Sequence, residues 1–308
     1  MRALITGAEG QLGRELVRCA PQSVELLAVD IAELDITDDT AVRATCSAFA
    51  PTIVINAAAY TAVDRAESEP ERAFAVNEGG ARNVARAAAE HDARMVHVST
   101  DYVFDGTACR PYRPSDATRP VGVYGQSKLA GEEAVLSAAG ERAVIVRTAW
   151  LYSSFGTNFV KTMLRVLAER DVVRVVADQV GTPTWAANLS RVLWTLAARP
   201  EVHGVMHWTD AGVASWYDFA VAIREEALAF GLIARAAPVM PIRTEDYPTP
   251  VKRPSYSVLD KSASWALLGE SAPACHWRSA LRMMLREMTT DTSTPVGRVS
   301  PSHRVASS

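Results

Sequence analysis

The beginning of the chain predicts a strand that turns into a helix through three glycines. An apolar run, Ala3–Thr6, comes first; Gly7, Gly10 and Gly13 follow at a spacing of three, and a helical pattern continues through Leu16. Glycines at such a turn let the backbone approach a pyrophosphate closely, and the helix start offers it unpaired N–H groups. This order is typical of a dinucleotide-binding unit, although the turn alone is a weak signal.

Strands and helices continue to alternate after this unit. Further apolar strands are expected at Glu25–Val29, Thr52–Ile55, Arg94–Ser99 and Ala143–Thr148, with helical patterns between them. The alternation predicts an α/β fold with a doubly wound, Rossmann-like parallel sheet that has helices on both faces. The second half is less regular, and we expect a smaller mixed α/β lobe that supplies the substrate pocket.

The expected domains follow from this division. The dinucleotide-binding domain takes mainly residues 1–150 and the substrate lobe mainly residues 151–288, with some strands and helices returning to the first domain. Residues 289–308 are rich in Ser, Thr and Pro and hold almost no large apolar side chain. Such a segment buries too little surface to stay ordered, so we expect a disordered tail.

An acidic residue, Asp30, ends the second strand. It follows Gly7 by about 20 positions, the usual separation of a ribose-binding carboxylate from its glycine turn. We expect Asp30 to bind the adenosine ribose and to favour NADH, because it would repel the 2′-phosphate of NADPH; a solvated strand end is the alternative. Asp35 and Ile36 lie where an adenine edge would be held. The small residues of Asn56–Thr61, after the third strand, leave room for a flat ring or form only a packed loop.

A hydroxyl, a phenol and an ammonium group have the spacing needed to protonate a carbonyl oxygen. Thr100 falls just after the fourth strand, and Tyr124 and Lys128 lie one turn apart on an expected helix, Tyr124–Ala139. We expect Thr100 to hydrogen-bond the carbonyl oxygen, Tyr124 to deliver the proton as hydride arrives, and Lys128 to lower the pKa of Tyr124. The alternative is an inert helix surface. The glycine turn and Asp30 in the same chain favour a carbonyl reductase.

Composition limits the other partners. A net charge of −3 gives no basic surface for nucleic acid, and no apolar run approaches the roughly 18 residues of a membrane span. Cys19, Cys46, Cys109 and Cys275 lie far apart and no secretory leader precedes the fold, which favours reduced thiols in the cytoplasm. We therefore expect a small-molecule pocket, in which Trp150 stacks on a hexose.

Longer motifs carry a resemblance to a known family. They are Asn56–Glu67, Ser99–Phe104, Arg147–Trp150, and Tyr247–Pro250 together with Arg253 and Pro254. On these stretches the chain resembles the extended short-chain dehydrogenase/reductases and, more narrowly, the dTDP-4-dehydrorhamnose reductase family, over nearly everything from Arg2 to Glu287. The resemblance implies that NADPH or NADH reduces the 4-keto group of dTDP-4-dehydro-β-L-rhamnose (dTDP-6-deoxy-L-lyxo-4-hexulose) to dTDP-L-rhamnose.

The resemblance also implies the roles of single residues. Those that would contact the cofactor, with the glycine turn included, are Gly7, Gly10, Gln11, Leu12, Gly13, Asp30, Asp35, Ile36, Ala59, Tyr60, Thr61, Tyr124 and Lys128. Those that would contact the sugar nucleotide are Thr100, Asp101, Trp150 and Arg253. The family accepts both nicotinamides, which tempers the preference for NADH inferred from Asp30.

Some members of the family are similar to dimers that magnesium links through three glutamates. Glu15 and Glu287 match two of these positions, and Asn188 stands at the third. Loss of one carboxylate weakens a site for a hard cation. We therefore expect at most a weak Mg²⁺ site, and a monomer or a weak homodimer.

Two other functions fit the sequence. One is a 4-ketoreductase for another dTDP-deoxysugar. The other is a non-catalytic NAD(P)-binding subunit that resembles the regulatory subunit of methionine adenosyltransferase and holds a dinucleotide without turnover. The presence of Thr100, Tyr124 and Lys128 argues against the second.

Overall fold

A six-stranded parallel sheet forms the centre of the structure, a computed structural model that describes residues 1–271 and 274–291. The strands lie in the order β10-β5-β4-β3-β1-β2, and every neighbouring pair runs parallel. This arrangement confirms the expected doubly wound, Rossmann-like sheet. Its strands are β1 (Arg2–Thr6), β2 (Glu25–Val29), β3 (Ile53–Asn56), β4 (Arg94–Thr100), β5 (Ala143–Thr148) and β10 (Gly204–His207).

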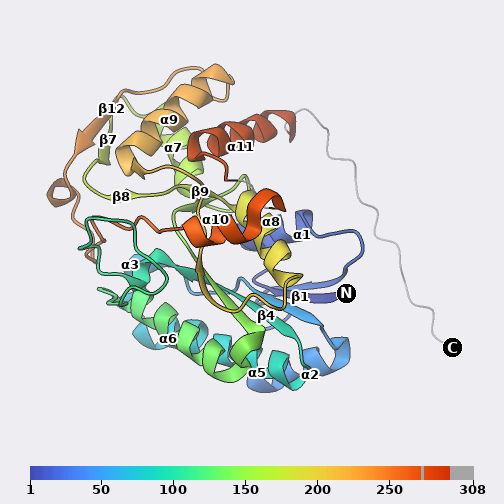
Figure 1. The fold of residues 1–308 in the computed structure, drawn as a ribbon. Helices are drawn as coiled ribbons and strands as arrows, with labels where there is room; N and C mark the ends of the chain where they lie inside the picture. The colour runs from blue at the N-terminus through green and yellow to red at the C-terminus, as the bar shows by residue number, and fades with distance from the viewer. Residues whose placement is uncertain (272–273, 292–308) are drawn as a thin grey trace.

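Helices cover both faces of this sheet (Figure 1). Successive side chains of a strand point to opposite faces, so Ile5 of β1 joins one hydrophobic core and Leu4 joins the other. The core on the Ile5 face includes α1 (Gln11–Arg18) and α8 (Ala186–Ala197). The core on the Leu4 face includes α2 (Asp39–Phe49), α5 (Ala81–Glu90) and α6 (Val123–Ala139).

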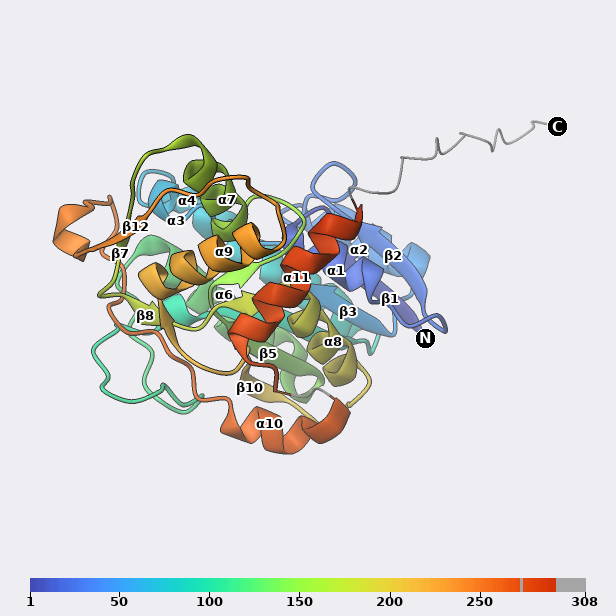
Figure 2. The same cartoon turned by 90° about the horizontal axis from the view of Figure 1, so that it is seen from above.

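A second, smaller lobe lies beside the carboxyl ends of the central strands. Its core packs Phe219 and Trp277 against Leu167 and Leu281. Figure 2 shows its helices grouped together: α7 (Phe159–Glu169), α9 (Trp216–Ala229) and α11 (Trp277–Asp291). The short strands form parallel pairs of β6 (Leu151–Tyr152) with β9 (Thr184–Trp185) and β7 (Val173–Val176) with β12 (Val239–Ile242), and an antiparallel pair of β8 (Val180–Gly181) with β11 (Ala214–Ser215).

The helical pattern between β3 and β4 does not form one continuous α-helix at residues 70–90. It is divided into α4 (Pro70–Phe74), a π-helical segment at Ala75–Gly80, and α5. The wide turn carries the side chain of Asn77, which is buried and bonds both the backbone N–H and the backbone carbonyl of Tyr60. The interruption therefore holds the segment after β3 in place. The remaining helices are α3 (Val63–Ala66) and α10 (Ser262–Leu268).

Residues 289–291, which were expected to belong to the disordered tail, are part of a helix. Helix α11 continues to Asp291, and the hydroxyls of Thr289 and Thr290 donate to the carbonyls of Arg286 and Glu287 within it. The rest of the expected tail, residues 292–308, lies outside the described residues.

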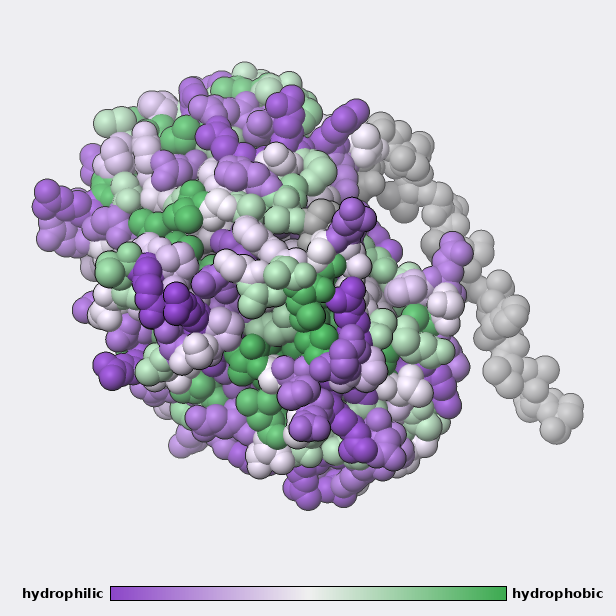
Figure 3. Space-filling model, in the orientation of Figure 1, coloured by the Kyte–Doolittle hydropathy of each residue, from purple (hydrophilic) through white to green (hydrophobic). Residues whose placement is uncertain are grey.

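Figure 3 shows hydrophilic residues over most of one face, with apolar residues gathered near its middle. Within the described part of the chain, every helix is too short or too polar to cross a bilayer.

Candidate active site

A cleft of about 770 Å³ opens along the carboxyl edge of the central sheet. Open parallel sheets bind their ligands at this edge, where the strand order reverses, and here the reversal lies at β1. Most of the site residues expected from the sequence line it: Gly7, Gly10, Gln11, Leu12, Gly13, Asp30, Asp35, Ile36, Ala59, Thr61, Thr100, Asp101, Tyr124, Lys128, Trp150 and Arg253.

The glycine turn has the geometry that a pyrophosphate needs. Gly7 has φ +73°, and a Cβ there would lie 2.6 Å from the backbone nitrogen of Ala58. A Cβ on Gly13 would collide with the carbonyl oxygen of Gly7. Gly10 precedes α1 without any side-chain cap, so the first turn of the helix presents its N–H groups to the cleft. The turn therefore fits the diphosphate of a nicotinamide dinucleotide.

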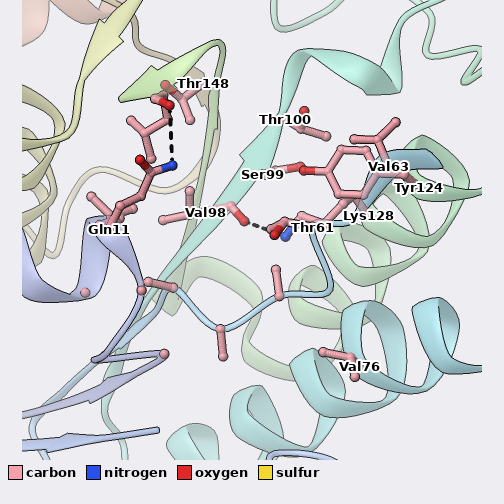
Figure 4. Close-up of a pocket in the computed structure, with 18 of the residues that line it drawn as sticks. Gln11, Thr61, Val63, Val76, Val98, Ser99, Thr100, Tyr124, Lys128 and Thr148 are labelled. Atoms are coloured by element: carbon pink, nitrogen blue, oxygen red, sulfur yellow. Dashed lines mark hydrogen bonds between the residues drawn. The ribbon is translucent and has the colours of Figure 1, made fainter. Parts of the chain in front are cut away.

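Gln11 adds an unpaired acceptor to this end of the cleft. Its Nε2 donates to the carbonyl of Leu151 at 3.3 Å, while its buried Oε1 has no partner among the described protein atoms. Figure 4 shows Gln11 and the catalytic candidates on opposite sides of the cleft.

Asp30 is hydrogen-bonded to the backbone of the glycine turn. Its carboxylate accepts the backbone N–H of Glu9 at 2.7 Å and that of Ile31 at 2.8 Å. Asp35 closes a turn by accepting the backbone N–H of Thr37 at 2.9 Å. Among the described residues that line the cleft, the basic ones are Lys128 and Arg253, which both lie at its other end.

The segment after β3 lines the cleft with its small residues but not with Tyr60. Ala57, Ala58, Ala59 and Thr61 face the cavity. The Tyr60 hydroxyl instead donates to Glu69 at 2.9 Å. The side chain of Tyr60 therefore points away from the expected cofactor, because Glu69 supplies a charged hydrogen-bond partner outside the cleft.

Tyr124 and Lys128 enter the cleft from the first turns of α6, beside Thr100 and Val98 (Figure 4). The helix comes this close because it has glycines where it crosses its neighbours. A Cβ on Gly125 would collide with the carbonyl of Tyr102. The Lys128 Nζ donates to the carbonyl of Val98 at 2.7 Å, and the Thr100 hydroxyl donates to Asp101 at 3.1 Å.

The pKa of Tyr124 is not lowered as expected. Burial raises it to about 12, hydrogen bonding by Thr100 opposes the rise, and the Asp101 carboxylate adds to it. Burial also lowers the pKa of Lys128 to about 8, against the attraction of Glu132. The shift of the Tyr124 pKa thus follows from burial, Thr100 and Asp101, whereas the Lys128 Nζ donates to the carbonyl of Val98 on β4.

Asp101 is a buried acid beside the catalytic candidates. Burial raises its pKa to about 6, and hydrogen bonds from Ser257 and Thr100 oppose the rise. One carboxylate oxygen, Oδ2, is buried without a partner among the described protein atoms. Asp101 therefore has a free acceptor at the wall of the cleft.

Trp150 and Arg253, which were expected to contact the sugar nucleotide, line the cleft together with a residue that the sequence did not indicate. The Trp150 indole stacks on that of Trp216, which also lines the cleft. Arg253 donates to Asp64 at 2.9 Å. Trp216 gave no signal, because its position at the start of α9 is remote in sequence and only the second lobe brings it to the cleft.

A buried ion pair beneath the site was also missed. Glu132 binds Arg147 at 2.6 Å, and Ser99 donates to the same carboxylate at 2.5 Å. Glu132 lies one helical turn after Lys128, and this spacing was the available signal. The buried His97 lies on the other side of Lys128, with Nε2 3.5 Å from Nζ.

The glutamates of the expected magnesium site are joined by an arginine. Arg18 binds Glu15 at 2.6 Å and Glu287 at 2.9 Å, and Asn188 donates to Asp210. No group of three or more potential metal-ligating side chains is found in residues 1–271 and 274–291. A guanidinium thus pairs with both glutamates in this structure, and the weak Mg²⁺ site stays a prediction.

Comparison with known proteins agrees with this geometry. The family model described as the RmlD substrate binding domain matches residues 1–290. The chain belongs to the dTDP-4-dehydrorhamnose reductase family. A curated member of that family from Aggregatibacter actinomycetemcomitans is 43% identical over 288 residues, which cover 91% of this chain and 97% of the relative.

Two further relatives are also named as reductases of dTDP-sugars. A crystal structure of dTDP-4-dehydrorhamnose reductase from Bacillus anthracis in complex with NADP superposes with a TM-score of 0.86 at 36% identity, and covers 93% of this chain and 99% of that one. A probable dTDP-4,6-dihydroxy-2-methyloxan-3-one 4-ketoreductase from Streptomyces antibioticus is 43% identical over 285 residues, 92% of this chain and 94% of the relative. The chain is thus an oxidoreductase of this reductase family.

Proposed function

We propose that the protein reduces the 4-keto group of dTDP-4-dehydro-β-L-rhamnose to give dTDP-L-rhamnose, a precursor of cell-wall or surface polysaccharide, with NADPH or NADH. The observation that carries the proposal is that Thr100, Tyr124 and Lys128 line one cleft together with the glycine turn. The name of the family to which the chain belongs supports the substrate. The free thiols of all four cysteines are consistent with action in the cytoplasm.

The bound nicotinamide would supply the hydride. Its diphosphate would lie on the Gly7–Gly13 turn, and Asp30 would accept a hydrogen bond from the adenosine ribose. Lys128 would hold the second ribose. These residues fit the cofactor because the turn has no room for side chains and Gln11 has an unpaired acceptor.

The reacting carbonyl oxygen would lie between Thr100 and Tyr124. The Thr100 hydroxyl would donate to this oxygen as negative charge develops there, an interaction made mainly in the transition state. Tyr124 would transfer its phenolic proton to the same oxygen. A phenol whose pKa is about 12 is a weak acid, so it holds its proton until an alkoxide forms beside it.

The test is a spectrophotometric assay of NADH and NADPH consumption with purified dTDP-4-keto-6-deoxyhexuloses. We expect turnover with the L-lyxo sugar and identification of dTDP-L-rhamnose by NMR. Faster reduction of another 4-keto sugar would instead support the alternative that the Streptomyces relative represents. Binding of the dinucleotide without turnover of any keto sugar would support the non-catalytic alternative.

A further inference from the structure

Asn56 fixes the orientation of its own side-chain amide. Its Oδ1 accepts hydrogen bonds from the backbone N–H of Ala58, at 3.1 Å, and from the hydroxyl of Thr6, at 2.7 Å. A backbone N–H can only donate, so the amide oxygen and not the amide nitrogen must face Ala58. The Nδ2 group of Asn56 therefore points the other way, toward His97.

This orientation decides where His97 carries its proton. The Asn56 Nδ2 lies 3.1 Å from the His97 Nδ1, and because an amide N–H only donates, Nδ1 must accept and carry no proton. His97 is 1% exposed, and burial, followed by the charge of Lys128, lowers its pKa well below the ordinary value. The neutral ring thus carries its proton on Nε2.

The Nε2–H group of His97 faces Lys128. The two nitrogens are 3.5 Å apart. An ammonium group has three donors and no acceptor, so two donors meet when Lys128 is charged, whereas a neutral amine offers a lone pair to the ring. The hydrogen bond from Nζ to the carbonyl of Val98, at 2.7 Å, keeps the nitrogen in this place.

Other groups act on the same equilibrium. Burial of Lys128, which is 2% exposed, favours the amine, and the Glu132 carboxylate favours the ammonium. Arg147 neutralises part of that carboxylate. The titratable or charged groups near Lys128 include Glu132 and Tyr124 of α6, His97 of β4, Asp101 just after β4, and Arg147 of β5, whereas Arg94 of β4 and Glu133 of α6 lie further along these elements.

We propose that His97 is a positioning residue whose Nε2–H favours the neutral amine of Lys128, and so sets the pH above which the ammonium is lost. The catalytic meaning of this step rests on the proposed function. The protonation equilibrium itself is a property of the protein without cofactor or substrate.

The substitution Asn56→Asp tests the inference with an almost isosteric change. A carboxylate accepts where the amide donated, so His97 moves its proton to Nδ1 and presents the Nε2 lone pair to Lys128. NMR titration of [¹³Cε]lysine in the cofactor-free protein reads out the amine directly, because the chain has only Lys128, Lys161, Lys252 and Lys261. We expect the pKa of Lys128 to rise by about one unit or more.

The double variant Asn56→Asp/His97→Leu separates two causes of this rise. The new carboxylate also attracts the ammonium directly, and only that attraction remains when the ring is absent. We expect at least half of the rise to be lost. His97→Phe replaces His97→Leu if the double variant does not fold.

Lys261 is the internal control, because it is buried beside Asp210 and Asp260 in another part of the molecule. It should titrate alike in every variant. If the pKa of Lys128 rises equally in the single and double variants, the proposed role of His97 is overturned. An ordinary lysine pKa for Lys128 in the parent protein also overturns it.

The pH profile of kcat/KM separates this inference from the proposed function. If the reaction requires Lys128 as an ammonium, the alkaline limb of the profile should move to higher pH in Asn56→Asp, together with the pKa of Lys128. If the pKa of Lys128 rises in Asn56→Asp but the alkaline limb of the kcat/KM profile stays in place, the role of His97 is supported and the proposed role of Lys128 is overturned.

Discussion

The indole of Trp150 lies flat on that of Trp216, with ring centroids 3.6 Å apart and planes 7° from parallel. Trp150 has φ +47°, a left-handed conformation that costs a non-glycine residue about 1–2 kcal/mol. A Cβ on Gly181 would lie 2.6 Å from the same indole. A strained residue is thus fixed at the cleft by packing on two sides.

Trp216→Leu should therefore weaken sugar-nucleotide binding without harming the chemical step. An aromatic stack contributes about 0.5–1.5 kcal/mol, so we expect KM for the keto sugar to rise about 3–10-fold with little change in kcat. Trp216→Phe keeps a stacking ring and serves as the matched control. A loss of kcat at constant KM would contradict a binding role.

Tyr124→Phe should lose most of its turnover, because it removes a proton donor and little packing. We expect kcat to fall about 10²–10⁴-fold while the Kd for NADH, measured by fluorescence titration, is unchanged. Tyr152→Phe is the control, since it removes a buried hydroxyl that has no partner among the described protein atoms and lies outside the cleft. Near-normal kcat in Tyr124→Phe would rule out the phenol as the acid.

Asp30→Asn should shift the nicotinamide preference toward NADPH. The change removes a negative charge at the end of the cleft where the described lining residues include no lysine or arginine. We expect the ratio of kcat/KM for NADPH to that for NADH to rise about tenfold, from one to two kcal/mol of relieved repulsion. Asp35→Asn, whose parent carboxylate binds Thr37, should change the ratio less. If the ratio is unchanged in Asp30→Asn, the Asp30 carboxylate does not determine the preference between NADH and NADPH.

Asp101 should make the protein less stable above pH 6 than below pH 4. Its folded pKa of about 6 exceeds the unfolded value of about 3.9, so the folded state binds the proton more tightly. The free energy of unfolding therefore falls as pH rises from about 4 to 6, by roughly 3 kcal/mol.

The variant Asp101→Asn isolates this contribution in urea denaturation from pH 4 to pH 8. We expect it to be more stable than the parent at pH 7 and equal to it near pH 4, whereas sugar binding becomes weaker. Asp210, whose pKa burial raises to about 7, titrates in both proteins and cancels in the difference. A difference that is constant with pH would show that Asp101 titrates normally.

Glu132→Gln should be strongly destabilising. The change leaves the buried Arg147 without its charge partner, which typically costs about 3–5 kcal/mol. Glu169→Gln removes an exposed partner of Arg165 and should cost roughly 0.5 kcal/mol or less. Chemical denaturation of both variants compares the pairs directly. If both variants lose a similar amount of unfolding free energy, the buried pair of Glu132 and Arg147 contributes little more than the exposed one.

The sequence determined the strands and the place of the cleft. Short apolar runs such as Ala3–Thr6 and Ala143–Thr148 favour buried strands, and strands that alternate with helices favour a parallel sheet. Their carboxyl ends then share one edge, which brings Gly7 and Thr100 together although the chain separates them widely. Spacing on one helix was enough to place Tyr124 and Lys128 on the same side.

Only the tertiary structure decided the state of these groups. The pKa of Tyr124 depends on burial and on Asp101 more than on the lysine one turn away. His97 comes within 3.5 Å of the Lys128 Nζ only when β4 and α6 pack together. Local sequence fixes backbone periodicity, whereas desolvation and charge depend on atoms from distant segments, and so the protonation of a buried site is a property of the folded chain.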